Sequence, residues 1–123
     1  MTCFAYDDLK GWRSIYPLNI FEEQFSKLCE KWEIGLDMLD EEDESETAIM
    51  ARATYCLFKS SLNQIRFIRA RDEGLYSDAV SAAKEELLIA KKMLALMNKN
   101  AAIGYEAANH YYFSKGQLAE KVI

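Results

Sequence analysis

The chain has 123 residues and a net charge of -5, and half of its residues are hydrophobic. This length fits one domain with a single core, and one proline and five glycines exclude a low-complexity linker. The acidic balance argues against binding to nucleic acid or to a membrane surface, because both need a concentrated cationic face. The sequence has a local basic stretch, which comprises Lys59, Arg66, Arg69 and Arg71. The acidic run 40–46 outweighs it in charge.

The sequence also indicates where the protein resides. It has no run of about twenty apolar residues, the length that a membrane-spanning helix needs. Acidic residues at Asp7 and Asp8 fall where a signal peptide would have its apolar stretch. We therefore expect a cytoplasmic protein. The three cysteines fit neither a disulfide framework nor a zinc cluster, so we expect reduced thiols, with Cys29 and Cys56 in the core.

The first predicted helix follows an irregular lead-in over residues 1–17. Asn19 is the expected N-cap, and Glu22 completes a capping box with it. Apolar side chains then recur every three or four residues to about residue 40, which predicts one buried stripe. The stripe comprises Phe21, Phe25, Leu28, Trp32, Leu36 and Leu39.

The second predicted helix spans about 46–73. The acidic run 40–46 is interpreted as a turn and as the opening of this helix, where carboxylates oppose the positive end of the helix dipole. Gly74 is the expected left-handed cap at its other end. The helix has a broad apolar face, which predicts neighbours on two sides. This face comprises Ile49, Met50, Ala53, Cys56, Leu57, Ile65, Phe67 and Ile68.

The third predicted helix, 77–98, has the most regular pattern. Its apolar residues alternate spacings of four and three, which predicts a seam with coiled-coil-like packing against antiparallel neighbours. We call these residues the seam: Tyr76, Val80, Ala83, Leu87, Ala90, Leu94 and Met97.

A short fourth helix is predicted over 115–123, with a capping box formed by Ser114 and Gln117. Its apolar spacing is still running at Ile123, so we expect the chain to be a piece of a longer protein. The predicted fold is thus all-α, an antiparallel bundle of three long helices with a short, truncated fourth helix.

Candidate chemistry centres on His110, the single histidine of the chain. Glu106 lies four residues earlier and would share a helix face with it, but two ligands are too few for a metal site. Nucleophile motifs and glycine-rich phosphate-binding loops are missing from the sequence. We therefore predict no enzyme activity, no metal and no cofactor, and keep a small metal-dependent enzyme as the least favoured alternative.

The aromatic segment 105–113 is the remaining candidate site. Its tyrosines could stack on sugar rings while its polar side chains offer hydrogen bonds. In the competing interpretation the tyrosines cross the end of the bundle with their rings inside and their hydroxyls outside. The candidate ligand-binding residues are Tyr105, Glu106, Asn109, His110, Tyr111 and Tyr112.

Two groups of stretches show a family resemblance. The later group comprises Ala82-Ala-Lys-Glu-Glu, Ala90-Lys-Lys-Met-Leu, Ile103-Gly-Tyr-Glu-Ala-Ala-Asn-His-Tyr-Tyr-Phe and Leu118-Ala-Glu-Lys-Val-Ile. The earlier group comprises Gly11-Trp-Arg-Ser-Ile-Tyr-Pro and Phe21-Glu-Glu-Gln-Phe-Ser-Lys-Leu-Cys-Glu-Lys-Trp-Glu. Together they resemble the helical C-terminal region of large proteins related to glycoside hydrolases.

This resemblance implies a helical accessory domain, because the catalytic barrel of such proteins normally lies N-terminal to the region. It marks Glu106, Asn109, His110 and Tyr111 as the most motif-like positions. The expected function is a non-catalytic accessory or interaction module that packs against another protein domain or against itself. A carbohydrate-binding module that uses the segment 105–113 is the alternative.

Overall fold

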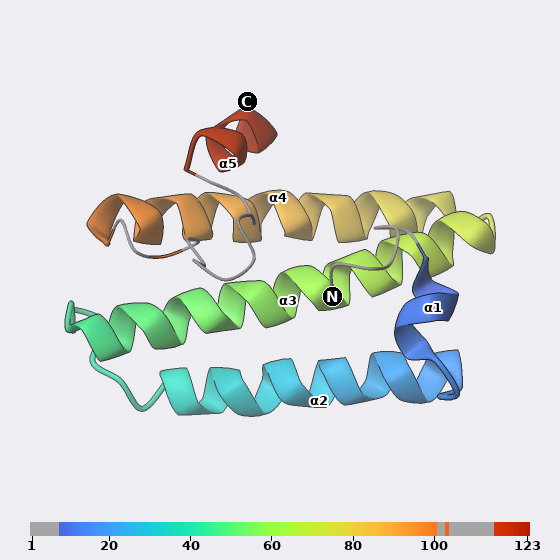
Figure 1. Ribbon diagram of the computed structural model, residues 1–123, viewed down its shortest axis with the longest axis horizontal. Coiled ribbons are helices and arrows are strands. Elements are labelled where there is room, and N and C mark those ends of the chain that lie inside the picture. Colours follow the sequence, from blue (N-terminus) through green and yellow to red (C-terminus); the bar gives the residue numbers. More distant parts are fainter. Residues whose placement is uncertain (1–7, 101–102, 104–114) are drawn as a thin grey trace.

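The computed structural model describes residues 8–100, 103 and 115–123. All regular elements among these residues are helices, which confirms the predicted all-α class (Figure 1). They are α1 (Leu9–Arg13), α2 (Leu18–Leu36), α3 (Glu46–Asp72), α4 (Tyr76–Lys99) and α5 (Lys115–Val122). Within these described ranges, no helix is both long enough and apolar enough to cross a membrane.

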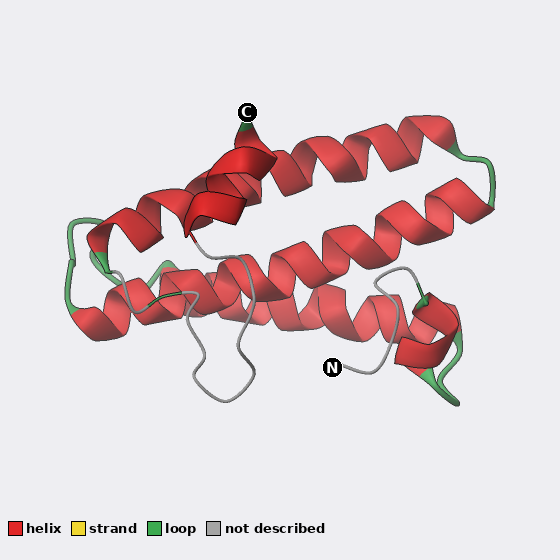
Figure 2. Ribbon diagram, turned by 45° about the horizontal axis from the view of Figure 1, so that its top comes forward, coloured by secondary structure: helices red, strands yellow, loops and turns green. Residues whose placement is uncertain are grey.

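Helix α3 is the central element, because it packs against α2 on one side and α4 on the other. Consecutive long helices run in opposite directions, and α5 lies on α4 (Figure 1). The two connections between the long helices lie at opposite ends of α3 (Figure 2). The two neighbours that the broad apolar face of residues 46–73 predicts are therefore present.

The segment before α2 differs from the prediction in two ways. Residues 1–17 were expected to be irregular, but Leu9–Arg13 form a short helix. Asp8 caps the start of this helix by accepting a hydrogen bond from the Gly11 backbone N–H at 2.8 Å. Predicting Asn19 as the N-cap of α2 was wrong. Pro17 holds that position without a side-chain bond, because its fixed φ suits the start of a helix and the missing N–H is not needed there.

The turn between α3 and α4 is set by Gly74. Gly74 has a φ of +74°, which is in the left-handed region. The backbone N–H of Leu75 donates to the carbonyl of Ala70 at 2.8 Å, and the backbone N–H of Gly74 donates to the carbonyl of Arg71 at 3.2 Å. These two bonds define a Schellman motif. The predicted left-handed cap is confirmed, and it reverses the chain so that α4 returns along α3.

The buried side chains form two clusters on opposite sides of α3. One joins α1 and α2 to the C-terminal half of α3 through Leu9, Ile65 and Ile68, with Trp12, Leu18, Phe21 and Phe25 packed against them. The other joins α3, α4 and α5, and comprises Ile49, Ala53, Cys56, Ile89, Ala90, Met93, Met97, Ile103 and Leu118. Each cluster fastens a different neighbour to α3.

The seam prediction for α4 is wrong over its N-terminal half. Tyr76, Val80 and Leu87 are 77%, 52% and 38% exposed. The face of α4 that is buried is turned by about one residue and comprises Ala79, Ala82, Ile89, Ala90, Met93 and Met97. The apolar arc of α4 is wide, so either of two neighbouring stripes could be buried. Small residues at positions 79 and 82 let α3 approach closely, and the adjacent large side chains therefore stay outside.

A similar shift occurs on α3. Three residues of its predicted core face are exposed, namely Met50 at 46%, Leu57 at 52% and Phe67 at 38%. Together with the exposed half of the seam, they leave apolar surface on α3 and α4 that the packing of the described helices does not cover.

Candidate functional site

A cavity of about 490 Å³ lies between α3 and α4, and we call it the α3–α4 groove. This volume falls within the range of roughly 300–1,000 Å³ that is usual for ligand pockets. Among the described residues that line it, Lys121 comes from α5. The others are Ser60, Asn63, Gln64, Phe67, Ile68, Ala82, Ala83, Glu86 and Leu87.

The carboxylate of Glu86 organises the polar end of the groove. It accepts hydrogen bonds from Ser60 Oγ at 2.7 Å and from Lys121 Nζ at 2.5 Å. Glu86 lies on the buried side of α4, where a charge needs such partners to offset its loss of water. The contacts tie α3, α4 and α5 together at one carboxylate.

Asn63 lies beside Glu86 and is only 1% exposed. In one orientation of its amide, Nδ2 donates to Glu86 Oε2 at 3.3 Å. With the amide rotated by 180°, Nδ2 donates to Glu85 Oε2 at 3.0 Å and the oxygen accepts from the Glu86 backbone N–H at 3.2 Å. We favour the rotated orientation because both ends of the amide then have partners.

The apolar end of the groove is continuous with the exposed part of the seam. Phe67 of α3 and Leu87 of α4 line the cavity from opposite walls, and Val80 and Tyr76 continue the apolar stripe along α4. Lys84 and Lys91 are exposed on the same helix, each following the seam at one residue after Ala83 or Ala90. They place positive charge along the outer border of the stripe.

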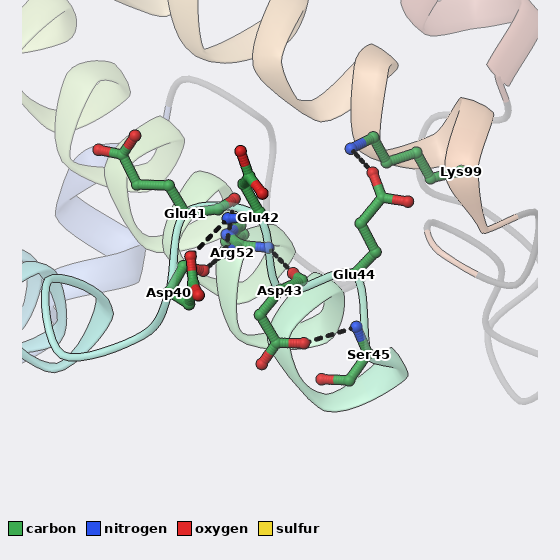
Figure 3. Close-up of polar contacts among 8 residues, drawn as sticks. All are labelled: Asp40, Glu41, Glu42, Asp43, Glu44, Ser45, Arg52 and Lys99. Carbon is green, nitrogen blue, oxygen red and sulfur yellow. Dashed lines mark hydrogen bonds and ion pairs between the residues drawn. The ribbon is translucent and has the colours of Figure 1, made fainter.

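The acidic turn between α2 and α3 is built around Arg52 (Figure 3). Its guanidinium donates to the backbone carbonyls of Asp43 at 2.5 Å and Asp40 at 2.8 Å. Ser45 caps α3 by accepting from the Ala48 backbone N–H at 3.3 Å. The predicted role of residues 40–46 as a turn and helix opening agrees with this geometry, and the arginine that shapes the turn is the part that the sequence did not indicate.

Two carboxyl groups in this turn have lowered pKa values. The Ser45 backbone N–H donates to Asp43 at 2.8 Å, and this bond, with the Ser45 side chain, lowers the pKa of Asp43. The Lys99 ammonium donates to Glu44 at 2.5 Å and lowers the pKa of Glu44 (Figure 3). Both carboxylates therefore stay ionised to a lower pH than usual.

The four residues of the local basic stretch on α3 are each matched by a carboxylate. Lys59 lies 3.2 Å from Glu85, Arg71 lies 2.9 Å from Asp72, and a single residue of α2, Glu22, is 3.3 Å from Arg66 and 2.8 Å from Arg69. The local basic stretch seen in the sequence is thus used between helices and within α3.

The two core thiols are as predicted. Cys29 and Cys56 are buried and free. Burial raises the pKa of both thiols, that of Cys56 to about 11. A thiol with a raised pKa is a poor nucleophile at neutral pH, so neither is placed for covalent chemistry.

The residues predicted for ligand binding all lie outside the described residues: Tyr105, Glu106, Asn109, His110, Tyr111 and Tyr112. The sugar-binding and metal-dependent alternatives that rest on them stay predictions. Within the part of the chain that is described, no three metal-ligating side chains gather.

The α3–α4 groove was not predicted from the sequence. A usable signal was present, because Ser60, Asn63 and Glu86 interrupt helix faces that are otherwise apolar.

Comparison with known proteins adds no relative to this picture. No profile of a protein family matches the chain, and neither a curated protein nor a solved structure does.

Proposed function

We propose that this chain is a non-catalytic helical interaction module that binds another protein through the exposed seam of α4. The observation that supports the proposal is the exposure of Tyr76, Val80 and Leu87 in a pattern typical of helix packing. Contiguous apolar surface beside a groove is characteristic of sites where proteins meet.

The arrangement around α3 supports the same proposal. Helix α4 buries one side against α3 and carries a second apolar stripe beside it. A helix with two apolar sides is expected where it has two neighbours. The antiparallel three-helix bundle predicted from the sequence belongs to this proposal as the scaffold that would present the stripe.

An accessory role also agrees with the resemblance to the C-terminal region of glycoside-hydrolase-related proteins. In that setting the partner would be another domain of a longer protein or a separate chain. The resemblance itself stays a prediction, since the comparisons returned no relative.

Site-specific photocrosslinking tests the proposal. A benzoylphenylalanine in place of Tyr76, which is 77% exposed, would report on the seam, and the same group in place of Ile34, 58% exposed on α2, serves as the matched control. Irradiation in an extract of the cells that express the protein is expected to give a discrete adduct at position 76 only. Adding Leu87→Asp should abolish it.

Two results would contradict the proposal. One is crosslinking of equal yield and pattern at positions 76 and 34, because that indicates unspecific contact. The other is the absence of any adduct at position 76 together with a strictly monomeric chain in analytical ultracentrifugation across a wide range of concentrations.

A further inference from the structure

The seam of α4 is covered in one half and exposed in the other. Ala90 and Met97 in its C-terminal half belong to the cluster that Leu118 of α5 completes, and Leu94 and Val122 pack against that cluster. Tyr76, Val80 and Leu87 in the N-terminal half are exposed. A short helix is thus already docked on one half of the stripe, and the other half offers the same kind of surface.

The α3–α4 groove gives this exposed half a pocket. Phe67 and Leu87 form apolar walls, and Ala83 leaves room between them. A volume of about 490 Å³ exceeds that of one large side chain. An amphipathic helix laid along the seam could therefore place an apolar anchor in the cavity, which is the usual way in which a groove recognises a helix.

The charges at the border select the partner. Lys84 and Lys91 are exposed beside the seam, whereas Lys121, which lines the groove, is paired with Glu86. The nearest groove carboxylate, Glu86, already accepts from Ser60 and Lys121. The border therefore presents positive charge, and a complementary helix would carry carboxylates next to its apolar stripe.

A second copy of the chain fits this border less well. In an antiparallel pair of α4 helices, Lys84 and Lys91 of one copy would face lysines of the other, and like charges at such positions are unfavourable. A parallel pair would bring lysines toward Glu86, whose carboxylate is engaged within its own chain.

From these observations we infer that the α3–α4 groove binds an amphipathic helix whose apolar stripe is bordered by acidic residues. This inference rests on the proposed interaction function and names the chemistry of the partner. The docked helix lies along Tyr76, Val80 and Leu87, inserts an apolar side chain between Phe67 and Leu87, and directs carboxylates toward Lys84 and Lys91.

Two synthetic peptides test the inference. Each has about fourteen residues, or two heptads, with leucine at positions a and d; one carries glutamate at the flanking positions and the other lysine. Fluorescence anisotropy with the full chain is expected to show saturable binding of the glutamate peptide and none of the lysine peptide. Binding of the glutamate peptide should weaken as salt is added.

Charge reversal locates the binding site. The double variant Lys84→Glu, Lys91→Glu is expected to weaken binding of the glutamate peptide about tenfold or more, since two border charges change sign. Lys31→Glu is the control, because Lys31 is an exposed lysine on α2, away from the groove. It should leave the affinity within about twofold, and circular dichroism should show the same helix content in all variants.

Three results would overturn the inference. They are equal binding of both peptides, no binding of either, and affinity that is unchanged by reversing Lys84 and Lys91. Failure here is distinct from failure of the proposed function: an adduct at position 76 that Leu87→Asp abolishes would keep the interaction role while removing the acidic helix as its partner.

Discussion

Single carboxylates decide much of how these helices are held together. Glu86 receives donors from α3 and α5, and Glu22 of α2 receives two arginines of α3. Polar contacts between helices contribute less free energy than apolar burial, but they fix which residues face each other, because an unpaired partner would be left away from water.

Replacing Glu86 tests this view. Glu86→Ala removes the acceptor of Ser60 and Lys121, and we expect the free energy of unfolding to fall by about 1–3 kcal/mol because two hydrogen bonds to a charged acceptor are lost. Glu86→Gln keeps an acceptor oxygen and should cost less. Chemical denaturation monitored by circular dichroism measures both, with the exposed Glu120→Ala as control. Equal stability of Glu86→Ala and the wild type would contradict the assigned role.

Asp43 gives a prediction for pH. Hydrogen bonds with Ser45 lower the pKa of Asp43 in the folded protein. At pH values above the usual pKa of 3.8, the ionised carboxylate therefore stabilises the fold. That stabilisation is lost as the pH falls through the lowered folded value. The difference in melting temperature between the wild type and Asp43→Asn should therefore be constant near neutral pH and shrink on acidification below about pH 4.

A control separates this bond from net charge. Glu41→Gln also removes one negative charge from the turn, while the bond between Asp43 and Ser45 remains. If Asp43→Asn and Glu41→Gln gave the same melting curves at every pH, the bond to Ser45 would not be the cause.

At the scale of helices, each of the four predicted helices has a counterpart, but α1 was not predicted and α2 ends at Leu36 rather than at about residue 40. The faces that the helices bury were predicted less well. The second helix was predicted over 46–73, and α3 spans Glu46–Asp72. The agreement is close because local features define the ends of this helix, namely the caps at Ser45 and Gly74. The turned face of α4 could not be predicted, because its apolar arc is wide and the choice between neighbouring stripes depends on the shape of α3.

Truncation of two nearby residues distinguishes the stripes of α4. Ile89 is 6% exposed and Leu87 is 38% exposed. Ile89→Ala should lower the free energy of unfolding by about 2–5 kcal/mol, as expected for a buried aliphatic side chain. Leu87→Ala should cost clearly less, about 1 kcal/mol. Urea denaturation measures both, and a larger loss for Leu87→Ala would restore the seam predicted from the sequence.

Gly35 and Gly74, both near the C-terminal ends of helices, are expected to respond to substitution in opposite ways. Gly74 has a φ of +74°, where an L side chain is strained, and Gly74→Ala should cost about 1 kcal/mol or more. Gly35 lies within α2 with nothing within 4 Å of an added Cβ, so Gly35→Ala should stabilise by about 0.5–1 kcal/mol. Thermal denaturation compares them, and a stabilising Gly74→Ala would contradict the Schellman assignment.

For the molecule as a whole, α3 is the shared support, and the two core clusters lie on its opposite sides. The class of fold followed from helical periodicity, which is a local property. The candidate site did not, because the groove arises from how much apolar surface α3 and α4 leave uncovered, and that depends on the contact between them.

The position of α3 also gives the two sides of the protein different optical signals. Both tryptophans of the chain lie on the side of α1 and α2: Trp12 packs in that cluster, and Trp32 stacks edge-on against Phe58 with its indole N–H bonded to the Ala51 carbonyl at 2.9 Å. Tryptophan emission therefore follows the release of α1 and α2, whereas far-ultraviolet circular dichroism follows all helices. A single cooperative unit would make the two traces superimpose, and any offset between them would measure how independently α4 leaves the shared helix.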